Sequence, residues 1–163
     1  TKNNNILLHF DEKWIYKDYV NEYENIEPTF DDFYKFILDI ADKTQRNIHI
    51  SSGFKNNDIL NKLKLEMTLS DKYYFKDYNS KKIFLHTNLS FIDLKEIIYN
   101  SDKIICCHGA PTHLASAMGK EIIDIYEKSE ELSYKKWNSH FRNYKFLYRS
   151  NFTDLSNKIL QLL

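Results

Sequence analysis

Residues 103–119 have the sequence KIICCHGAPTHLASAMG, and a second apolar run, IIDIY, follows at 122–126. The first of these runs, 104–107, is what we expect of a strand buried on both faces of a parallel sheet. Pro111 suits the first turn of a helix, where a missing N–H costs nothing, and Gly119 suits the position just past a helix end. The stretch therefore predicts a βαβ unit: strand, tight turn, short helix, strand.

The turn at 108–110 is the part of this unit that could meet a ligand. The N-terminus of a helix presents unpaired backbone N–H groups and the positive end of the helix dipole, so it can bind a phosphate. The small residues are not spaced as in a P-loop or in the motif GxGxxG. A purely structural turn is therefore the alternative, because most such units in α/β domains bind nothing.

Apolar runs along the whole chain predict six strands, at 6–10, 47–51, 83–86, 104–107, 122–126 and 144–148. Helical patterns separate them, which indicates an α/β protein with a Rossmann-like, doubly wound parallel sheet of about six strands. We expect the strand order 3-2-1-4-5-6, with a switch point between the first and fourth strands, where such sheets bind ligands. A short edge strand at 73–75 is left open.

The helices have recognisable starts. Thr29, followed by Asp32, predicts a capped helix whose apolar stripe consists of Phe33, Phe36, Ile37, Ile40 and Ala41. Other helices are predicted at 58–64, from Ser90, at 130–137 and from Thr153. The residues that we expect to be almost fully buried are Phe36, Ile40, Ile104, Ile105, Ile123 and Ile125. Residues 11–28 show no regular pattern.

Composition limits the classes of function. The 163 residues suffice for one domain, and we treat 1–163 as a single unit. Twenty-three basic and 23 acidic residues balance, which argues against broad binding to nucleic acid. No apolar run reaches the roughly 18 residues of a transmembrane helix, and no signal peptide is visible. Cys106 and Cys107 are expected to be free, buried and on opposite faces of a strand, in a reducing compartment.

Four histidines lie at or near the carboxyl ends of the first four strands: His9, His49, His86 and His108. A shared metal site is one hypothesis, since imidazole is a common zinc ligand. Hydrogen-bonded core histidines are the alternative, because no carboxylate is obviously shared among them. We expect no metal. A receiver-type signalling domain needs an acidic residue where His86 stands, so that class is disfavoured.

The segment 108–119 resembles the signature of heptosyltransferase-type glycosyltransferases, which have the GT-B fold. The matching positions are Pro111, His113, Leu114, Ala115, Ala117 and Gly119. Three positions differ from the family: His108 stands in place of the usual Asp, Gly109 in place of Ser or Thr, and Ala110 in place of Gly. In the family these positions face the nucleotide diphosphate, so the differences concern the identity of the donor.

The resemblance implies that the chain is the carboxyl-terminal, donor-binding half of such an enzyme. The whole enzyme would move a sugar, such as a heptose, from an ADP- or UDP-type donor to a glycan or lipid-linked acceptor, as in lipopolysaccharide biosynthesis. The family's catalytic base lies on the amino-terminal half, so we expect no catalytic residue here, no cofactor, and no transfer by this chain alone. We expect a cytoplasmic protein, peripheral to the inner membrane through the other half. The alternative is a non-catalytic nucleotide or nucleotide-sugar binding module.

The resemblance also implies which residues bind the donor. Lys13, directly after the first strand, would reach the phosphates, with Lys17 as the second candidate, because a metal-free transferase must neutralise its leaving diphosphate with side-chain cations. The other candidates are His86, Thr87, His108, Gly109, Ala110, Thr112, His113 and Glu127.

Some of these residues have simpler interpretations. His113 lies near the donor phosphates in the family but could equally be a helix-packing histidine. Glu127 could hold the ribose hydroxyls or be a surface carboxylate. Asp11 and Glu12, beside Lys13, are explained at least as well by a solvated charge run.

Overall fold

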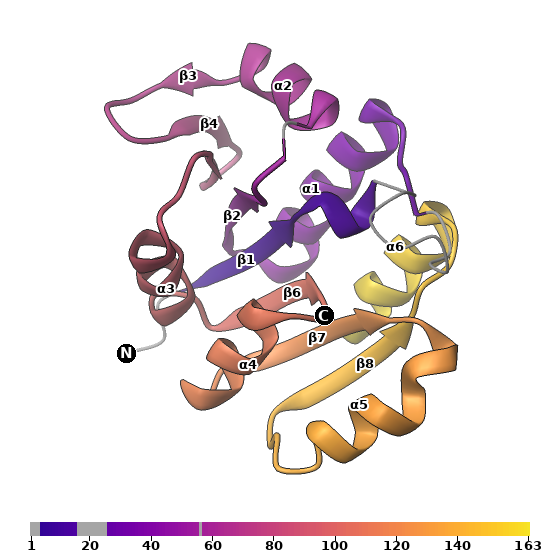
Figure 1. Ribbon diagram of the computed structural model, residues 1–163. Helices are drawn as coiled ribbons and strands as arrows, with labels where there is room; N and C mark the ends of the chain where they lie inside the picture. The colour runs from indigo at the N-terminus through magenta and orange to yellow at the C-terminus, as the bar shows by residue number, and fades with distance from the viewer. Residues whose placement is uncertain (1–3, 16–25, 56) are drawn as a thin grey trace.

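The computed structural model describes residues 4–15, 26–55 and 57–163 and consists of one eight-stranded sheet with helices on both faces (Figure 1). The strands lie in the order β3-β4-β5-β2-β1-β6-β7-β8. Their bounds are β1 Asn5–Phe10, β2 Asn47–Ser52, β3 Thr68–Leu69, β4 Tyr74–Tyr78, β5 Lys81–His86, β6 Lys103–Cys107, β7 Glu121–Tyr126 and β8 Tyr144–Tyr148.

The predicted order of the six main strands is confirmed. β5, β2, β1, β6, β7 and β8 pair in parallel, and the switch point lies between β1 and β6. The prediction of a wholly parallel sheet is wrong at one edge, where β4 pairs with β5 and β3 with β4 in antiparallel fashion. The reason is local: only two residues, 79–80, join the paired residues Tyr78 and Lys81, and so short a loop permits only a hairpin.

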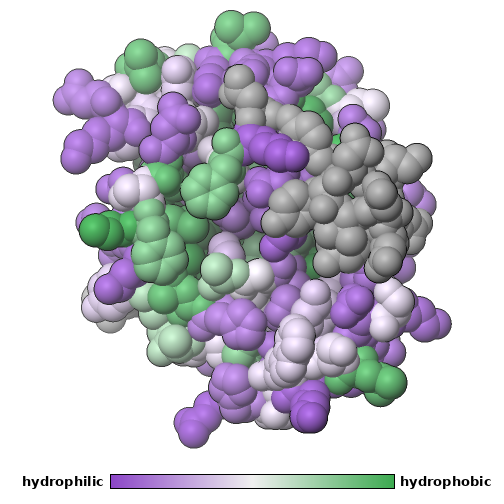
Figure 2. Space-filling view, viewed as in Figure 1, coloured by the Kyte–Doolittle hydropathy of each residue, from purple (hydrophilic) through white to green (hydrophobic). Residues whose placement is uncertain are grey.

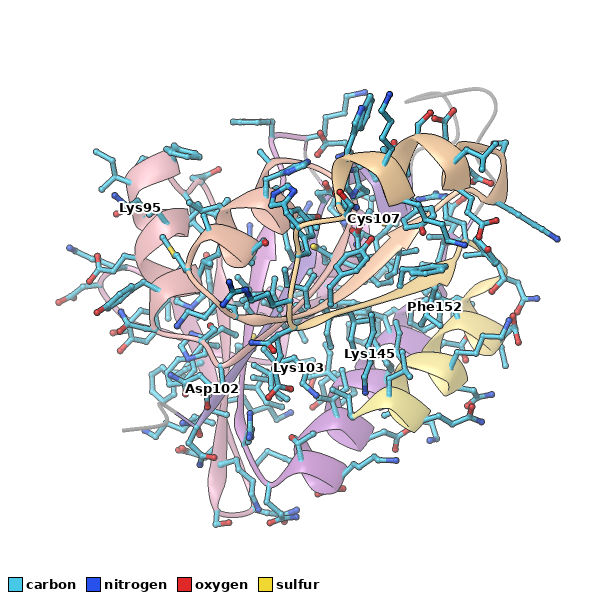
Figure 3. All side chains as sticks on the ribbon, turned by 90° about the horizontal axis from the view of Figure 1, so that it is seen from below. Lys95, Asp102, Lys103, Cys107, Lys145 and Phe152 are labelled. Atoms are coloured by element: carbon cyan, nitrogen blue, oxygen red, sulfur yellow. The ribbon has the colours of Figure 1, made fainter. Side chains whose placement is uncertain are left out.

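Helices cover the sheet in two layers. α1, α2 and α6 pack on one face, and α3, α4 and α5 on the other, as the view along the sheet shows (Figure 3). The helix bounds are α1 Phe30–Thr44, α2 Asp58–Leu65, α3 Phe91–Tyr99, α4 Ala110–Ala117, α5 Glu131–Trp137 and α6 Phe152–Leu162, with short 3₁₀ turns η1 Glu12–Trp14 and η3 Lys128–Glu130. Among the described residues, no helix is long and apolar enough to cross a membrane.

The alternation of side chains along β6 divides the core between the two faces. Ile105 and Cys107 face α1 and α6, whereas Ile104 and Cys106 face α3 and α4. Both cysteines are free and buried, and burial raises the pKa of both thiols. The expected core residues are confirmed, each at most 2% exposed: Phe36, Ile40, Ile104, Ile105, Ile123 and Ile125.

The helix caps follow the sequence signals with one exception. Thr29 caps α1, and Ser90 forms a capping box with Asp93 at α3, as predicted. The last helix starts two residues earlier than predicted, because the side chain of Asn151, and not that of Thr153, accepts the N–H of Asp154. At the start of α3, Phe91 and Ile92 are 64% and 74% exposed.

Candidate functional site

A cavity of about 460 Å³ lies at the carboxyl edge of the sheet, beside the switch point. It is enclosed by the loops that follow β1, β2 and β5 and by the start of α4. Its lining residues are His9, Asp11, Glu12, Lys13, Ser52, Gly53, Phe54, Leu89, Ser90, Phe91, Leu94, Ala110, Pro111 and Leu114. Apolar side chains gather over α3 and α4 on the face drawn in Figure 2, and Phe54 at the rim is 99% exposed.

Lys13 reaches the 108–110 turn from the loop after β1. Its ammonium donates a hydrogen bond of 2.6 Å to the carbonyl of His108. Gly109 permits this approach, since a Cβ there would lie 2.5 Å from Lys13 Nζ. The φ of Gly109 is 167°, which is extended backbone open to any residue, so the glycine is needed for space and not for its conformation. The structure thus brings together Lys13 and the turn that the sequence singled out.

The backbone N–H groups of the turn are less available than the sequence suggested. The N–H of His108 donates to the carbonyl of Ile125, and that of Gly109 to the hydroxyl of Thr112. Pro111 has no N–H. Within the part of the chain that the structure describes, the N–H of Ala110 has no partner. An anion at this turn would therefore meet one backbone donor and the Lys13 ammonium.

A buried carboxylate supports the turn from below. Asp124, in the middle of β7, is fully buried and accepts hydrogen bonds from the Tyr144 hydroxyl at 2.8 Å and the Thr112 hydroxyl at 3.1 Å. His108 Nδ1 lies 2.6 Å from the same carboxylate. Thr112 is itself fully buried, so its side chain positions the turn and does not reach the cavity. The sequence signal for this cluster was Asp124, a lone carboxylate inside an apolar strand.

His108 and His113 are neighbours on the outer side of this cluster. Their rings meet edge to face with centroids 5.2 Å apart, and the ring of Tyr134 from α5 lies 4.0 Å from that of His108. His113 is exposed and also contacts the ring of Phe141 at 5.4 Å. Partial burial and the nearby His108 lower the pKa of His113, which favours the neutral imidazole.

Arg149, directly after β8, ties the edge of the sheet together, and the sequence analysis did not identify it. Its guanidinium donates to the carbonyl of Lys13 at 2.6 Å and to the Cys107 sulfur at 3.4 Å. It also forms an ion pair of 3.0 Å with Glu127. Glu127, predicted to hold a ribose, is thus engaged in a largely buried ion pair. A cation directly after a predicted strand was the available signal.

Asp11 and His9 line the other wall of the cavity. Both are buried, so Asp11 is not a solvated charge. Burial raises the pKa of Asp11 to about 7, against the opposing effect of Lys13. Burial lowers the pKa of His9 to about 4. His9 lies 3.7 Å from Asp11 and 2.8 Å from the Ser51 hydroxyl, but Ser51 is fully buried and out of reach of any substrate.

Glu12 packs unusually closely against the loop after β2. A Cβ on Gly53 would lie 2.0 Å from Glu12 Oε2, so only glycine fits there. That carboxylate oxygen is buried and has no hydrogen-bond partner among the described residues. Glu12 is therefore half-buried, which does not fit the interpretation as a solvated charge.

His86 and Thr87 lie apart from Lys13, in a groove on the other side of the first turn of α3. His86 pairs with His49 at 2.9 Å. The four strand-end histidines thus form three separate pairs, His9 with Ser51, His49 with His86 and His108 with Asp124. The described residues contain no group of three or more His, Cys, Asp or Glu that could hold a metal ion. Lys17 lies outside the described residues.

No protein-family model matches the sequence, and no curated protein matches it. One similar solved structure concerns EarP-mediated arginine glycosylation of translation elongation factor EF-P; it has a TM-score of 0.46 and 13% identity over 86% of this chain. Another is the wall teichoic acid polymerase TagF, with a TM-score of 0.45 and 9% identity over 98% of this chain. The match covers 40% of the first of those chains and 35% of the second, so this chain spans less than half of either.

Proposed function

We propose that this chain is the donor-binding half of a GT-B-type glycosyltransferase and that it holds the diphosphate of a nucleotide sugar at the 108–110 turn. The observation that supports this most is the position of Lys13, whose ammonium lies over the turn at the switch point and beside a 460 Å³ cavity. Cavities of this size accommodate small ligands. The heptosyltransferase-like signature occupies the same turn.

The role of Lys13 is electrostatic. Negative charge grows on the leaving diphosphate as the bond to the sugar breaks, and a fixed cation stabilises that charge most where water is largely excluded. The Lys13 side chain is only 18% exposed, and its ammonium donates a hydrogen bond to a neutral carbonyl and lies 4.0 Å from the Asp11 carboxyl. It can therefore exchange that carbonyl for a phosphate oxygen. The N–H of Ala110 is a second donor at the same place.

The proposal assigns to His108 a second contact with the donor, from the turn beside the cavity and not from the cavity lining. His108 Nδ1 is engaged by Asp124, so Nε2 is the ring nitrogen left for a ligand. Asp124 orients the ring in the way that carboxylates orient functional histidines elsewhere. Within the proposal, His108 hydrogen-bonds the diphosphate or the sugar, and His113 lines the same side.

The proposal includes a partner and an acceptor. The catalytic base belongs to an amino-terminal GT-B half, the donor is an ADP- or UDP-type sugar such as a heptose, and the acceptor is a glycan or lipid-linked saccharide, as in lipopolysaccharide synthesis at the cytoplasmic side of the inner membrane. The residues that differ from the family, at 108–110, would select among donors. Titration with ADP and UDP separately tests that selection.

Calorimetric titration of the 163-residue chain with ADP and UDP tests the core of the proposal. We expect weak binding, with a Kd on the order of 0.1–1 mM because half of the cleft is absent. Lys13→Ala should weaken it about five- to tenfold, and His113→Ala should weaken it as well, without unfolding the domain. Lys145→Ala is the matched control, because Lys145 lies on the α6 side of the sheet with its ammonium near Leu162 (Figure 3).

Two results would contradict the proposal. Diphosphate binding that is unchanged in both Lys13→Ala and His113→Ala would place the site elsewhere. Sugar transfer by the chain alone would mean that a catalytic base lies within it, with Asp11 as the first residue to substitute, since it is a buried carboxyl in the same cavity.

A further inference from the structure

A second hollow of about 560 Å³ lies on the α3 face of the sheet, between α3, the end of β5 and the loop before β4. It shares only Leu89 with the cavity beside Lys13, and the two lie on opposite sides of the first turn of α3. We call it the α3 groove. Its lining residues are Asn5, His49, Lys72, Tyr73, His86, Thr87, Asn88, Leu89, Asp93, Glu96, Ile97, Asn100 and Ser101.

The rings of His49, His86 and Tyr73 form the floor of the α3 groove, and Phe84 packs beside them. His49 and Phe84 are paired across β2 and β5, so their side chains lie on one face and their rings stack at 4.5 Å. The ring of His86, two residues after Phe84, lies edge to edge with that of His49, with centroids 5.2 Å apart and an angle of 6° between the planes, so the two imidazoles are nearly coplanar. Tyr73 stands edge-on to Phe84 at 5.4 Å. Such a surface offers ring faces and edges to a flat partner.

The two histidines also offer hydrogen bonds. His49 Nδ1 and His86 Nε2 are 2.9 Å apart, so one of them donates and the other accepts. In a neutral pair the two outer nitrogens, His49 Nε2 and His86 Nδ1, must then be one acceptor and one donor. Neither outer nitrogen has a partner among the described residues, although His86 is only 8% exposed. Burial lowers the pKa of both imidazoles to about 4, so the pair is neutral at pH 7.

The charges around the α3 groove disfavour an anion. With the histidines neutral, one cation, Lys72, faces two carboxylates, Asp93 and Glu96. The rest of the polar lining is uncharged and includes the amide side chain of Asn88, which can donate and accept. A phosphorylated ligand or a nucleic acid would meet net negative charge, and an apolar peptide would leave the polar lining unpaired.

We propose that the α3 groove binds a neutral saccharide, with a sugar ring against the aromatic floor and a hydroxyl on the His49–His86 pair. A hydroxyl both donates and accepts, which matches the donor and acceptor that the pair presents. The carboxylates and the amide bind further hydroxyls. This site is separate from the proposed diphosphate site and does not depend on it.

Calorimetry and histidine-ring NMR on the whole chain test this site. The probes are the neutral hexasaccharides maltohexaose, cellohexaose and hexa-N-acetylchitohexaose, with hexagalacturonate and a thymidine hexanucleotide as anionic comparators. We expect at least one neutral hexasaccharide to bind and to shift the ring signals of His49 and His86. Tyr73→Ala should weaken that binding about tenfold by removing one wall of the floor. Tyr99→Ala is the matched control, since Tyr99 is 64% exposed and outside the groove.

A second pair of variants separates this proposal from the first. Lys13→Ala should leave saccharide binding unchanged, and Tyr73→Ala should leave ADP or UDP binding unchanged. His49→Phe keeps a stacking ring but loses the hydrogen bonds, so it should weaken binding even if Tyr73→Ala alters the hairpin. The proposal is overturned if no neutral probe binds below about 10 mM. It is equally overturned if hexagalacturonate or the hexanucleotide binds more tightly than every neutral probe.

Discussion

Both the backbone carbonyl and the side-chain ammonium of Lys13 are hydrogen-bonded. Arg149 binds its backbone carbonyl at 2.6 Å, and the carbonyl of His108 accepts its ammonium at the same distance. These two contacts join β1 to β6 and to the end of β8, which are distant in sequence. Arg149 is therefore a positioning residue for Lys13, and Glu127 holds Arg149 in turn through an ion pair.

The neighbouring Asp11 gives a prediction about pH. Its pKa is about 7 in the folded protein, above the ordinary value of 3.8, because burial disfavours the carboxylate. A folded-state pKa that is raised means that the folded protein binds the proton more tightly than the unfolded chain. Stability from this group is therefore present below pH 3.8 and is lost as pH rises to about 7.

Asp11→Asn should remove this loss, since the amide stays neutral and can still accept the N–H of Lys13. We expect the variant and the wild type to be equally stable near pH 4. The variant should gain up to about 1.4 kcal/mol per pH unit through the window and then level off. Urea denaturation of both proteins from pH 4 to pH 8 measures the difference, and a difference that does not change with pH would contradict the raised pKa.

The two glycines that flank α4, Gly109 and Gly119, have different roles. Gly119 ends α4 with φ of +67°, and the N–H groups of Gly119 and Lys120 return to the carbonyls of Ser116 and Ala115 in a Schellman arrangement. A Cβ on Gly119 would meet nothing within 4 Å. Gly109 at the other end is extended, but a Cβ there would meet the Lys13 ammonium.

Replacing each of these glycines by alanine should separate stability from binding. Gly119→Ala should cost about 1 kcal/mol of unfolding free energy through its left-handed φ and leave ADP or UDP binding unchanged. Gly109→Ala should leave stability nearly unchanged, because the flexible end of Lys13 can move, and should weaken diphosphate binding. Urea denaturation and calorimetry on the two variants serve as controls for each other. Equal effects of both variants on binding would argue against a site over Gly109.

At the scale of the whole molecule, β1 and β6 form the centre on which both layers of helices depend. Ile105 on β6 is completely buried, beside Leu8 of β1 and Ile123 of β7. Loss of its side chain would leave a cavity that neighbouring strands cannot close without breaking the sheet register.

Ile105→Ala should therefore lower the free energy of unfolding by roughly 2–5 kcal/mol. Leu132→Ala is a suitable control, since Leu132 on α5 is 85% exposed and its loss should have little effect. Urea denaturation of the two variants measures both. An unchanged midpoint for Ile105→Ala would mean that β6 is not central to the sheet.

The sequence by itself determined the elements and their order. Apolar runs, capping residues such as Thr29 and Ser90, and the glycine after α4 are local signals, and they predicted the order of six strands and the switch point. The 108–110 turn was a candidate on these local signals, whereas Lys13 was a candidate only through the resemblance to heptosyltransferases. Local periodicity suffices for the strand order because alternating strands and helices leave few permitted topologies.

Only the tertiary structure decided which side chains meet. The contact of Lys13 with His108 spans 95 residues, and that of Arg149 with Lys13 spans 136. The tertiary structure also directs the Thr112 side chain inward to Asp124 and places His86 away from the 108–110 turn. Burial and hydrogen bonding of polar groups depend on packing from several strands at once, and no local pattern in the chain encodes that packing.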